Sequence, residues 1–442
     1  MTTRQELKTA VCREIDRRSD EITSVCETIL GNPEPGFKEI KTAALVARKF
    51  AELGISYRDK LAITGVKGML KGRRDNPVVA VLGELDSLVV PDHPHADPST
   101  GAAHACGHNA QISMLIGVAM ALAGAGVMPE LDGSVALIAV PAEEYIEIEF
   151  RQGLRRDGKI RYLGGKAELI RTGEFDGIDL AMMTHTAALP KGKKLNIGGT
   201  SNGTVAKQIQ FIGKAAHAGG APHLGVNALN AATIAMVAIH AQRETFKDND
   251  TIRVHPIITK GGEVVNIVPA DVRMETYVRG KTLDAIKDAN QKVDRALKAG
   301  AMAVGAKVKI TTLPGYMPMQ NDSLFQEVYR KNAGRVLGRS TIMPGGHGTG
   351  STDMGDVSHI MPAIHPMIGG VTGTSHGSDY LVSDPKLAVI APAKIMAMTV
   401  IDLLVNGAQK AKEILSHGKP ALTKKEYLEL MDGFFKEETF QG

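Results

Sequence analysis

The chain reads His104-Ala105-Cys106-Gly107-His108-Asn109 and continues almost at once into an apolar segment at residues 112–123. Three of these side chains, His104, Cys106 and His108, can bind a divalent metal. A thiolate and imidazoles together suit zinc or another first-row transition ion. The apolar segment predicts a helix behind the loop, and Asn109 is expected to cap that helix. The segment therefore indicates a metal-binding loop of a hydrolase.

Apolar segments that predict buried strands lie on both sides of this loop. Residues 78–82 and 135–140 are uninterrupted apolar runs, as is typical of strands buried on both faces, and 180–183 is a third. Polar side chains follow each run: Glu84 and Asp86, then Glu143 and Glu144, then His185. Ligands of α/β proteins bind at this end of the strands. Strands that alternate with helices predict a mostly parallel sheet with helices on both faces.

The composition is ordinary for a soluble enzyme. The 442 residues are 43% hydrophobic and 23% charged, and 52 basic minus 48 acidic residues leave a net charge of +4. That charge is too small to indicate binding to nucleic acid or a membrane. The three cysteines do not form a disulfide framework, and Met1 is followed by polar residues and not by a signal peptide. We expect a cytoplasmic protein.

The pattern changes after about residue 202. Strands are expected at 205–212, 251–259, 268–279 and 308–312, with helices at 226–240 and 283–299. The order β-α-β-β-α-β is the ferredoxin-like split unit. We therefore predict an inserted lid domain at 203–313, within a catalytic domain made of residues 1–202 and 314–442.

Cys106 and His108 are the strongest pair of candidate metal ligands, because an extended loop can bring positions i and i+2 together. The alternative is a buried structural cysteine beside a capping histidine. His104 would crowd the same loop, so we expect it to support the ligands without binding. His185, which ends a strand, and His376, in a small-residue loop, are candidate distant ligands, although fourteen histidines make a chance placement easy.

The adjacent carboxylates Glu143 and Glu144 point in different directions at the end of a strand. One can bind the metal while the other acts as general base on a water whose pKa the metal lowers toward about 7. The alternative is a solvated acidic pair. Asp86 can orient a metal-binding histidine, and its alternative is a loop carboxylate or helix cap.

Three residues of the predicted lid are candidates for substrate contacts. His217 lies in a small-residue loop, and Asn266 and Arg279 flank the third lid strand. An arginine can bind a substrate carboxylate with two hydrogen bonds, although position alone favours a surface arginine. The glycine-rich loop at 345–350 is a weak phosphate-binding signal because it lacks a P-loop lysine.

Taken together, these motifs resemble the aminoacylase and carboxypeptidase G family of metal-dependent amidohydrolases, nearest to its auxin-conjugate and aminobenzoyl-glutamate hydrolases. The resemblance extends from Asn32-Pro33-Glu34 to the helix after Ala391. Its specific motifs lie at 83–86, 104–109, 141–144, 216–225 and 351–358.

The resemblance implies a dimerising lid inserted in a zinc-peptidase-like α/β domain. It implies that Glu143 is the catalytic base, that Asp86 anchors the metal site, and that His217 reaches across the dimer to stabilise the oxyanion. Asn266 and Arg279 would hold the substrate. The implied ligands of Mn or Zn are Cys106, His108, Glu144, His185 and His376.

The chain departs from the family at three places. Asn109 stands where many relatives carry aspartate, although the aminobenzoyl-glutamate branch also has asparagine. Glu84 replaces a histidine ligand of other branches, which leaves one or two metal ions open. The segment 145–179 is longer than in simple aminoacylases, and we expect its arginines to shape the mouth of the pocket. They are Arg151, Arg155, Arg156 and Arg161.

The resemblance predicts a homodimeric hydrolase that cleaves the amide bond of an N-acyl or N-aroyl amino acid. The alternatives are a small dipeptidase, an aryl-amine aminohydrolase acting on a nitroanthranilate-type substrate, a non-catalytic binding protein, and a structural metal protein. The presence of Glu143 argues against the binding protein. A ligand set with one cysteine argues against a structural site, because structural zinc sites are usually cysteine-rich.

Overall fold

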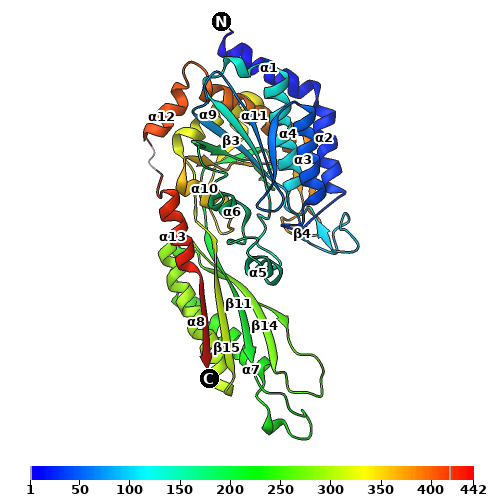
Figure 1. Cartoon of the computed structure of the whole chain (residues 1–442), viewed down its shortest axis with the longest axis vertical. Helices are drawn as coiled ribbons and strands as arrows, with labels where there is room; N and C mark the ends of the chain where they lie inside the picture. Colours follow the sequence, from blue (N-terminus) through cyan, green and yellow to red (C-terminus); the bar gives the residue numbers. More distant parts are fainter. Residues whose placement is uncertain (1, 418–419) are drawn as a thin grey trace.

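A computed structural model describes residues 2–417 and 420–442. The chain has two lobes (Figure 1). The larger lobe carries the N-terminus and a central sheet, and the second lobe is an elongated layer of long strands backed by helices.

The central sheet has six strands, in the order β1 (Ser56–Leu61), β2 (Gly65–Leu70), β6 (Ser134–Val140), β3 (Val78–Glu84), β7 (Leu180–Met182) and β19 (Ala363–Ile364). Strands β6, β3, β7 and β19 run parallel, whereas β1 and β2 form an antiparallel hairpin at one edge. The predicted mostly parallel sheet is therefore confirmed, and the hairpin is an addition that sequence patterning did not predict.

Helices cover both faces of this sheet. One face packs against α1 (Arg4–Arg17), α2 (Ser19–Leu30), α3 (Ile40–Glu52), α4 (His108–Gly124), α9 (Ser323–Leu337), α11 (Ala391–Leu404) and α12 (Gln409–His417). The other face packs against α6 (Gly165–Arg171), α10 (Met354–Ile360) and α13 (Lys424–Phe434). Val79 and Val81 point into the first cluster, while Ala80 and Leu82 point into the second. Because both faces of β3 are covered, its sequence is apolar throughout.

Helix α4 lies behind the metal-binding loop and is buried on nearly all sides. It begins at His108, with Gly107 at the N-cap position and a left-handed φ of +96°. The predicted cap by Asn109 is therefore wrong, because Asn109 already lies inside the helix and donates to the Cys26 sulfur at 3.3 Å.

The segment Lys386–Leu404, a π-helical turn (Lys386–Ile390) followed by α11, is long and apolar enough to cross a membrane by composition alone. It is 83% buried inside the larger lobe. Its apolar character is therefore that of a core helix.

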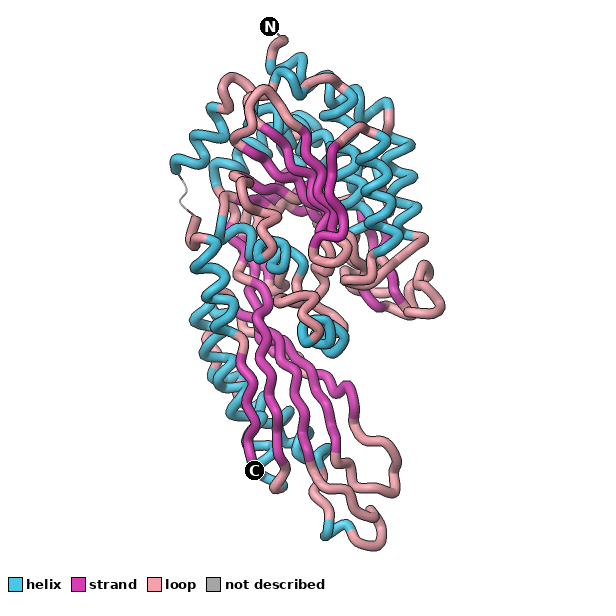
Figure 2. Tube along the Cα trace, viewed as in Figure 1, coloured by secondary structure: helices cyan, strands magenta, loops and turns pink. Residues whose placement is uncertain are grey.

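The second lobe is an antiparallel sheet with two helices on one face (Figure 2). At one edge, β12 (Arg253–Val254) and β13 (Ile257–Lys260) lie end to end along β14 (Asp271–Gly280). The sheet continues with β11 (Gly203–Ile212), β15 (Lys307–Tyr316) and β23 (Lys436–Gln441). Helices α7 (Ala228–Ala241) and α8 (Leu283–Val304) pack against it. The chain order β11-α7-β12/β13-β14-α8-β15 is the predicted ferredoxin-like unit.

The C-terminal strand differs from the expected domain division. The sequence predicts that residues 436–441 belong to the catalytic domain, but β23 pairs along six residues with β15 of the lid. Helix α13 contacts both α10 and β15, so the C-terminal segment bridges the two lobes. Strand β23 begins with the charged residues Lys436-Glu437-Glu438 and lies at the edge of the sheet. Edge strands commonly carry charged side chains, so this segment lacks the apolar pattern of the central strands.

Short strands form the remaining small sheets. They are β4 (Leu88–Val89), β5 (Ala102–Ala103), β8 (His185–Thr186), β9 (Leu195–Ile197), β10 (Thr200–Ser201), β16 (Met319–Gln320), β17 (Ile342–Pro344), β18 (His347–Gly348), β20 (Met367–Ile368), β21 (Val371–Thr372) and β22 (Leu381–Val382).

Candidate active site

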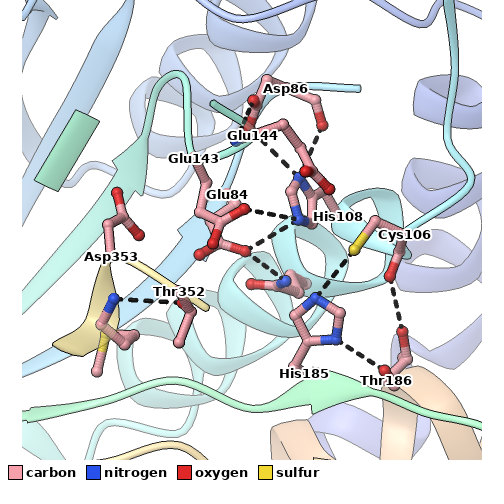
Figure 3. Close-up of polar contacts among 12 residues, drawn as sticks. Glu84, Asp86, Cys106, His108, Glu143, Glu144, His185, Thr186, Thr352 and Asp353 are labelled. Carbon is pink, nitrogen blue, oxygen red and sulfur yellow. Dashed lines mark hydrogen bonds and ion pairs between the residues drawn. The ribbon is translucent and has the colours of Figure 1, made fainter. Parts of the chain in front are cut away.

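The carboxyl ends of the parallel strands bring the candidate side chains to one edge of the central sheet. Strand β3 ends at Glu84, β6 leads into Glu143 and Glu144, and β7 leads into β8 with His185. Figure 3 shows the side chains of Glu84, Cys106, His108 and His185 converging from these separate segments. Their meeting follows from the parallel register, since parallel strands end on the same side.

Two histidines turn their Nε2 atoms toward the other donor atoms of the cluster. The His108 Nδ1 lies 2.8 Å from the Asp86 carbonyl oxygen, and the His185 Nδ1 lies 2.7 Å from the Thr186 carbonyl oxygen. A carbonyl can only accept, so each Nδ1 carries a proton and each Nε2 is left for another partner. The His185 Nε2 is 3.4 Å from the Cys106 sulfur.

Glu144 and His376 complete the cluster from the other side. The Glu144 backbone N–H donates to Asp86 Oδ2 at 2.9 Å, and Glu144 Oε1 lies 3.3 Å from His376 Nε2. His376 has a left-handed φ of +66°, and its backbone N–H donates to the Ala105 carbonyl at 2.8 Å. That bond ties the distant loop at 376 to the loop that carries Cys106.

Three groups of donor atoms have the spacing of a metal site. They are Cys106 with His108 and His185, Cys106 with Glu144 and His376, and Glu84 with His108 and Glu143. Cys106 is shared by the first two groups. His104 belongs to none of these three groups of described residues, and its buried ring nitrogens have no hydrogen-bond partner.

A second observation, besides the spacing of the donor atoms, indicates that these residues can hold a divalent cation. His108 Nε2 and Glu144 Oε1 are both buried and lack a hydrogen bond to any described group, and their nearest partners are other donor atoms of the cluster, Glu84 Oε2 at 3.1 Å and His376 Nε2 at 3.3 Å. Buried polar atoms are normally paired, and thiolate, imidazole and carboxylate are the ligand types of zinc and manganese. A cation between these atoms would satisfy them.

Glu143 lies beside the donor cluster and faces the cavity. Its carboxylate is 3.9 Å from His108 Nε2. Burial, together with the negative charges of Glu84 and Glu144, raises the pKa of Glu143 well above its usual range. A carboxyl group with a raised pKa at such a site can accept a proton and return it.

A buried charge network lies under the cluster and was missed by sequence reasoning. Lys166 on α6 contacts Glu84 at 2.5 Å and also contacts Asp353, and all three side chains are fully buried. Burial opposes ionisation of Glu84, but the positive charge of Lys166 together with those of His108 and His185 outweighs it and lowers the Glu84 pKa. Gln111 donates to the same carboxylate at 2.7 Å. Asp353 lies within the motif at 351–358, whereas no sequence pattern indicates a role for Lys166.

The cluster opens into a cavity of about 590 Å³ between the two lobes. Arg279 lines it together with Cys106, Glu143 and His376, and its guanidinium lies 5.0 Å from the centre of the Tyr277 ring. No ion pair joins Arg279 to a described carboxylate, and its Nε has no hydrogen-bond partner. The glycine-rich loop 345–350 forms part of the wall, a role that its weak phosphate-binding signal did not predict.

His217 and Asn266 lie near each other in the lid, but neither lines this cavity in the described chain. His217 and Ile267 form an isolated antiparallel β-bridge, and the Asn266 carbonyl accepts a hydrogen bond from the Ala218 N–H at 3.0 Å. Within one chain, the structure therefore separates these two residues from Arg279 and the donor cluster.

The arginines of the long segment 145–179 do not shape the pocket mouth, so that expectation is wrong. Arg151 is completely buried, Arg155 lies over the Phe435 ring, and Arg161 pairs with Asp432 on α13. Tyr145 and Ile146 of this segment do line the cavity.

Comparison with known proteins agrees with this geometry. The model of peptidase family M20/M25/M40 matches residues 80–393. The chain belongs to this family. Membership makes it a metal-dependent hydrolase, as predicted.

Relatives of the M20 family show what the chain is similar to. A mouse Xaa-Arg dipeptidase is 30% identical over 75% of this chain and 71% of its own length. An IAA-amino acid hydrolase from Arabidopsis thaliana is 25% identical over 88% of this chain and 87% of its own. A dinuclear metal-binding M20 peptidase from Bacillus subtilis has the same fold, with a TM-score of 0.62 and 23% identity over 87% of this chain and 98% of that one.

Proposed function

We propose that this M20 protein cleaves the amide bond of an N-acyl or N-aroyl amino acid. The observation that carries the proposal is one cavity that combines the donor cluster around Cys106, the carboxyl of Glu143 and the guanidinium of Arg279, which pairs with no described carboxylate. These are the parts that amide hydrolysis of an amino-acid conjugate requires: a metal site, a proton carrier and a carboxylate clamp.

We assign the metal to Cys106, His108, Glu144, His185 and His376. When bound there, Mn²⁺ or Zn²⁺ would act as a Lewis acid on the substrate carbonyl and would acidify water. Cys106 belongs to two of the donor groups, and this spacing favours two ions per subunit. Asp86 positions two of the ligands through the His108 ring and the Glu144 amide.

The protein's own groups then have distinct tasks. Arg279 binds the substrate carboxylate with its guanidinium. Glu143 takes a proton from the attacking water and delivers it to the nitrogen of the departing amino acid. The Tyr316 hydroxyl donates to the Glu143 carbonyl oxygen and so fixes the backbone that carries this base.

We further propose that the enzyme is a cytoplasmic homodimer that pairs through the lid, residues 203–313. The lid exposes apolar side chains on α7, β13 and the adjoining loops, including Val237 at 65% and Val265 at 100% exposure. Exposed apolar patches of this kind often mark interfaces. Pairing there would let the partner's His217 and Asn266 complete a site that lacks them in one chain.

A substrate panel tests the proposed function. The protein, loaded with Mn²⁺ or Zn²⁺, is assayed with hippurate, other N-acyl amino acids, aminobenzoyl-glutamate, dipeptides and aryl amines. We expect the highest kcat/KM with an acyl or aroyl amino acid. Ammonia release from aryl amines without amide cleavage would contradict the proposal.

A small-dipeptidase activity is the second candidate. The similarity to Xaa-Arg dipeptidases favours it. The cavity does not favour a basic dipeptide, because its acidic side chains among the described lining residues are Glu143 and Glu144, which the site already uses. Preference for Xaa-Arg over acyl amino acids in the same panel would select this alternative.

A further inference from the structure

The backbone between β6 and the two catalytic glutamates is held in an uncommon conformation. Strand β6 ends at Val140, and Ala142 follows with a φ of +51°. This left-handed region is unfavourable for a residue with a side chain. The turn at Ala142 sets the direction in which Glu143 and Glu144 leave the strand.

Glu39 holds the amide side of Ala142. Its carboxyl group is completely buried at the start of α3. Glu39 Oε1 accepts from the Ala142 N–H at 2.7 Å, and Oε2 accepts from the Thr64 hydroxyl at 2.6 Å. None of the ion pairs among described residues involves Glu39, so hydrogen bonds are what keep this carboxyl group in place.

Arg151 lies on the carbonyl side of the same residue. It comes from α5 (Ile148–Arg156), in the long segment that follows the glutamates, and is completely buried. Its Nη1 donates to the Leu163 carbonyl at 2.8 Å and lies 3.5 Å from the Ala142 carbonyl, which also accepts from the Gly165 N–H at 3.1 Å. The guanidinium packs over the Phe37 ring and forms no ion pair with a described carboxylate.

The rest of this short segment is held in the same way. The Glu143 carbonyl accepts from Tyr316, and the Glu144 N–H donates to Asp86. Buried side chains therefore contact the backbone of each residue from Ala142 to Glu144. Such support keeps reacting groups within a fraction of an ångström of their working positions.

We propose that Glu39 and Arg151 are positioning residues, which clamp Ala142 so that Glu143 and Glu144 point into the metal site. Neither lines the cavity, so they act through the backbone and not on the substrate. The inference rests on the proposed roles of Glu143 as base and Glu144 as ligand.

Paired substitutions at Glu39 separate positioning from general stability. Glu39→Gln keeps a carbonyl oxygen for the Ala142 N–H and an amide that can face Thr64, whereas Glu39→Val removes both bonds. We expect kcat at saturating metal to fall by about 10- to 100-fold in Glu39→Val, with KM nearly unchanged, and to be largely retained in Glu39→Gln. Metal affinity, measured by calorimetric titration, should fall by about 10- to 100-fold in Glu39→Val alone.

Glu34→Ala is the matched control, because the Glu34 carboxylate accepts from backbone N–H groups of α3 in the same segment. It should lower the melting temperature without changing kcat. Arg151→Met should resemble Glu39→Val. The double variant should lose less than the product of the two single losses, since both act on one residue.

Three results would overturn the inference: full kcat and metal affinity in a folded Glu39→Val, equal losses in Glu39→Gln and Glu39→Val, or full kcat and metal affinity in a folded Arg151→Met. Failure of the proposed function is a separate outcome. If the wild-type protein cleaves no amide, the difference in metal affinity between the two Glu39 variants still tests the clamp.

Discussion

At the scale of single residues, the site depends on atoms that are buried and left without ordinary partners. His108 Nε2 and Glu144 Oε1 face other donor atoms in place of hydrogen-bond partners. Glu143 is kept protonatable by its surroundings, since burial and two neighbouring carboxylates raise its pKa. These features destabilise an empty site and become favourable once a cation binds.

Glu143→Gln should bind metal normally but lose activity by about 100- to 10,000-fold, because general acid–base catalysis typically contributes that much. Metal analysis and kcat on the best substrate of the panel measure this. Glu149→Gln is the control, since Glu149 is an exposed residue of the same chain segment. A Glu143→Gln enzyme with more than a tenth of wild-type kcat would remove the proposed base.

Arg279→Met should weaken recognition of the substrate carboxylate. A hydrogen bond to a charged group contributes about 1.5–3 kcal/mol, so kcat/KM should fall by roughly 10- to 100-fold for an acyl amino acid. The corresponding acyl amino-acid amide, which lacks the carboxylate, should be affected little. Arg273→Met on the same strand serves as control, because Arg273 already pairs with Glu149 and Asp271. Equal losses on both substrates would argue against a carboxylate clamp.

At the scale of elements, the C-terminal strand β23 ties the end of the chain to the lid. Glu438 contacts Lys298 on α8 and accepts from Lys436 at 2.7 Å. Hydrogen bonds and the charges of these two lysines lower the Glu438 pKa to about 2. The strand is thus held partly by ion pairs that depend on pH.

The sign of this dependence follows from the lowered pKa. Glu438 stabilises the fold at pH values above the ordinary glutamate pKa of about 4.3, and this stabilisation is lost as the pH falls toward 2. We expect Glu438→Gln to lower the melting temperature at pH 7 and to lower it less at pH 3. Glu437→Gln, on the neighbouring exposed position, should show a smaller difference. A Glu438→Gln effect that grows on acidification would contradict the assignment.

At the scale of the whole molecule, His217 does not line the cavity of its own chain, and the proposed dimer would supply it from the partner. Mixed dimers of Glu143→Gln and His217→Ala subunits test this. If His217 acts across the dimer, each mixed dimer regains one intact site, and activity rises above that of either parent. His217→Ala alone should lose about 100- to 1000-fold, as expected for one oxyanion donor.

The complementation result depends on dimer formation, which light scattering measures independently. Val237→Asp on the exposed side of α7 should shift the protein toward monomer. Ile40→Asp, an equally exposed site on the larger lobe, should not. If mixed dimers form but stay inactive, His217 acts within its own chain or has no part in catalysis.

The sequence by itself determined the elements and the class of the molecule. The apolar runs at 78–82 and 135–140 predicted strands that are buried on both faces. This was correct, since helices cover both faces of β3 and β6. The order of elements in 203–313 predicted the ferredoxin-like unit, and the spacing of Cys106 and His108 indicated a metal. These features are local, so they can be read from neighbouring residues.

Only the tertiary structure decided which distant groups meet. It joined Lys166, Glu84 and Asp353 in one buried network, brought Glu39 and Arg151 to Ala142, and added β23 to the lid. It also showed that Asn109 caps no helix and that the arginines of 145–179 lie away from the pocket mouth. Such contacts are set by how strands and helices pack around both cores, and a lysine or an arginine has the same sequence signature whether it is buried or exposed.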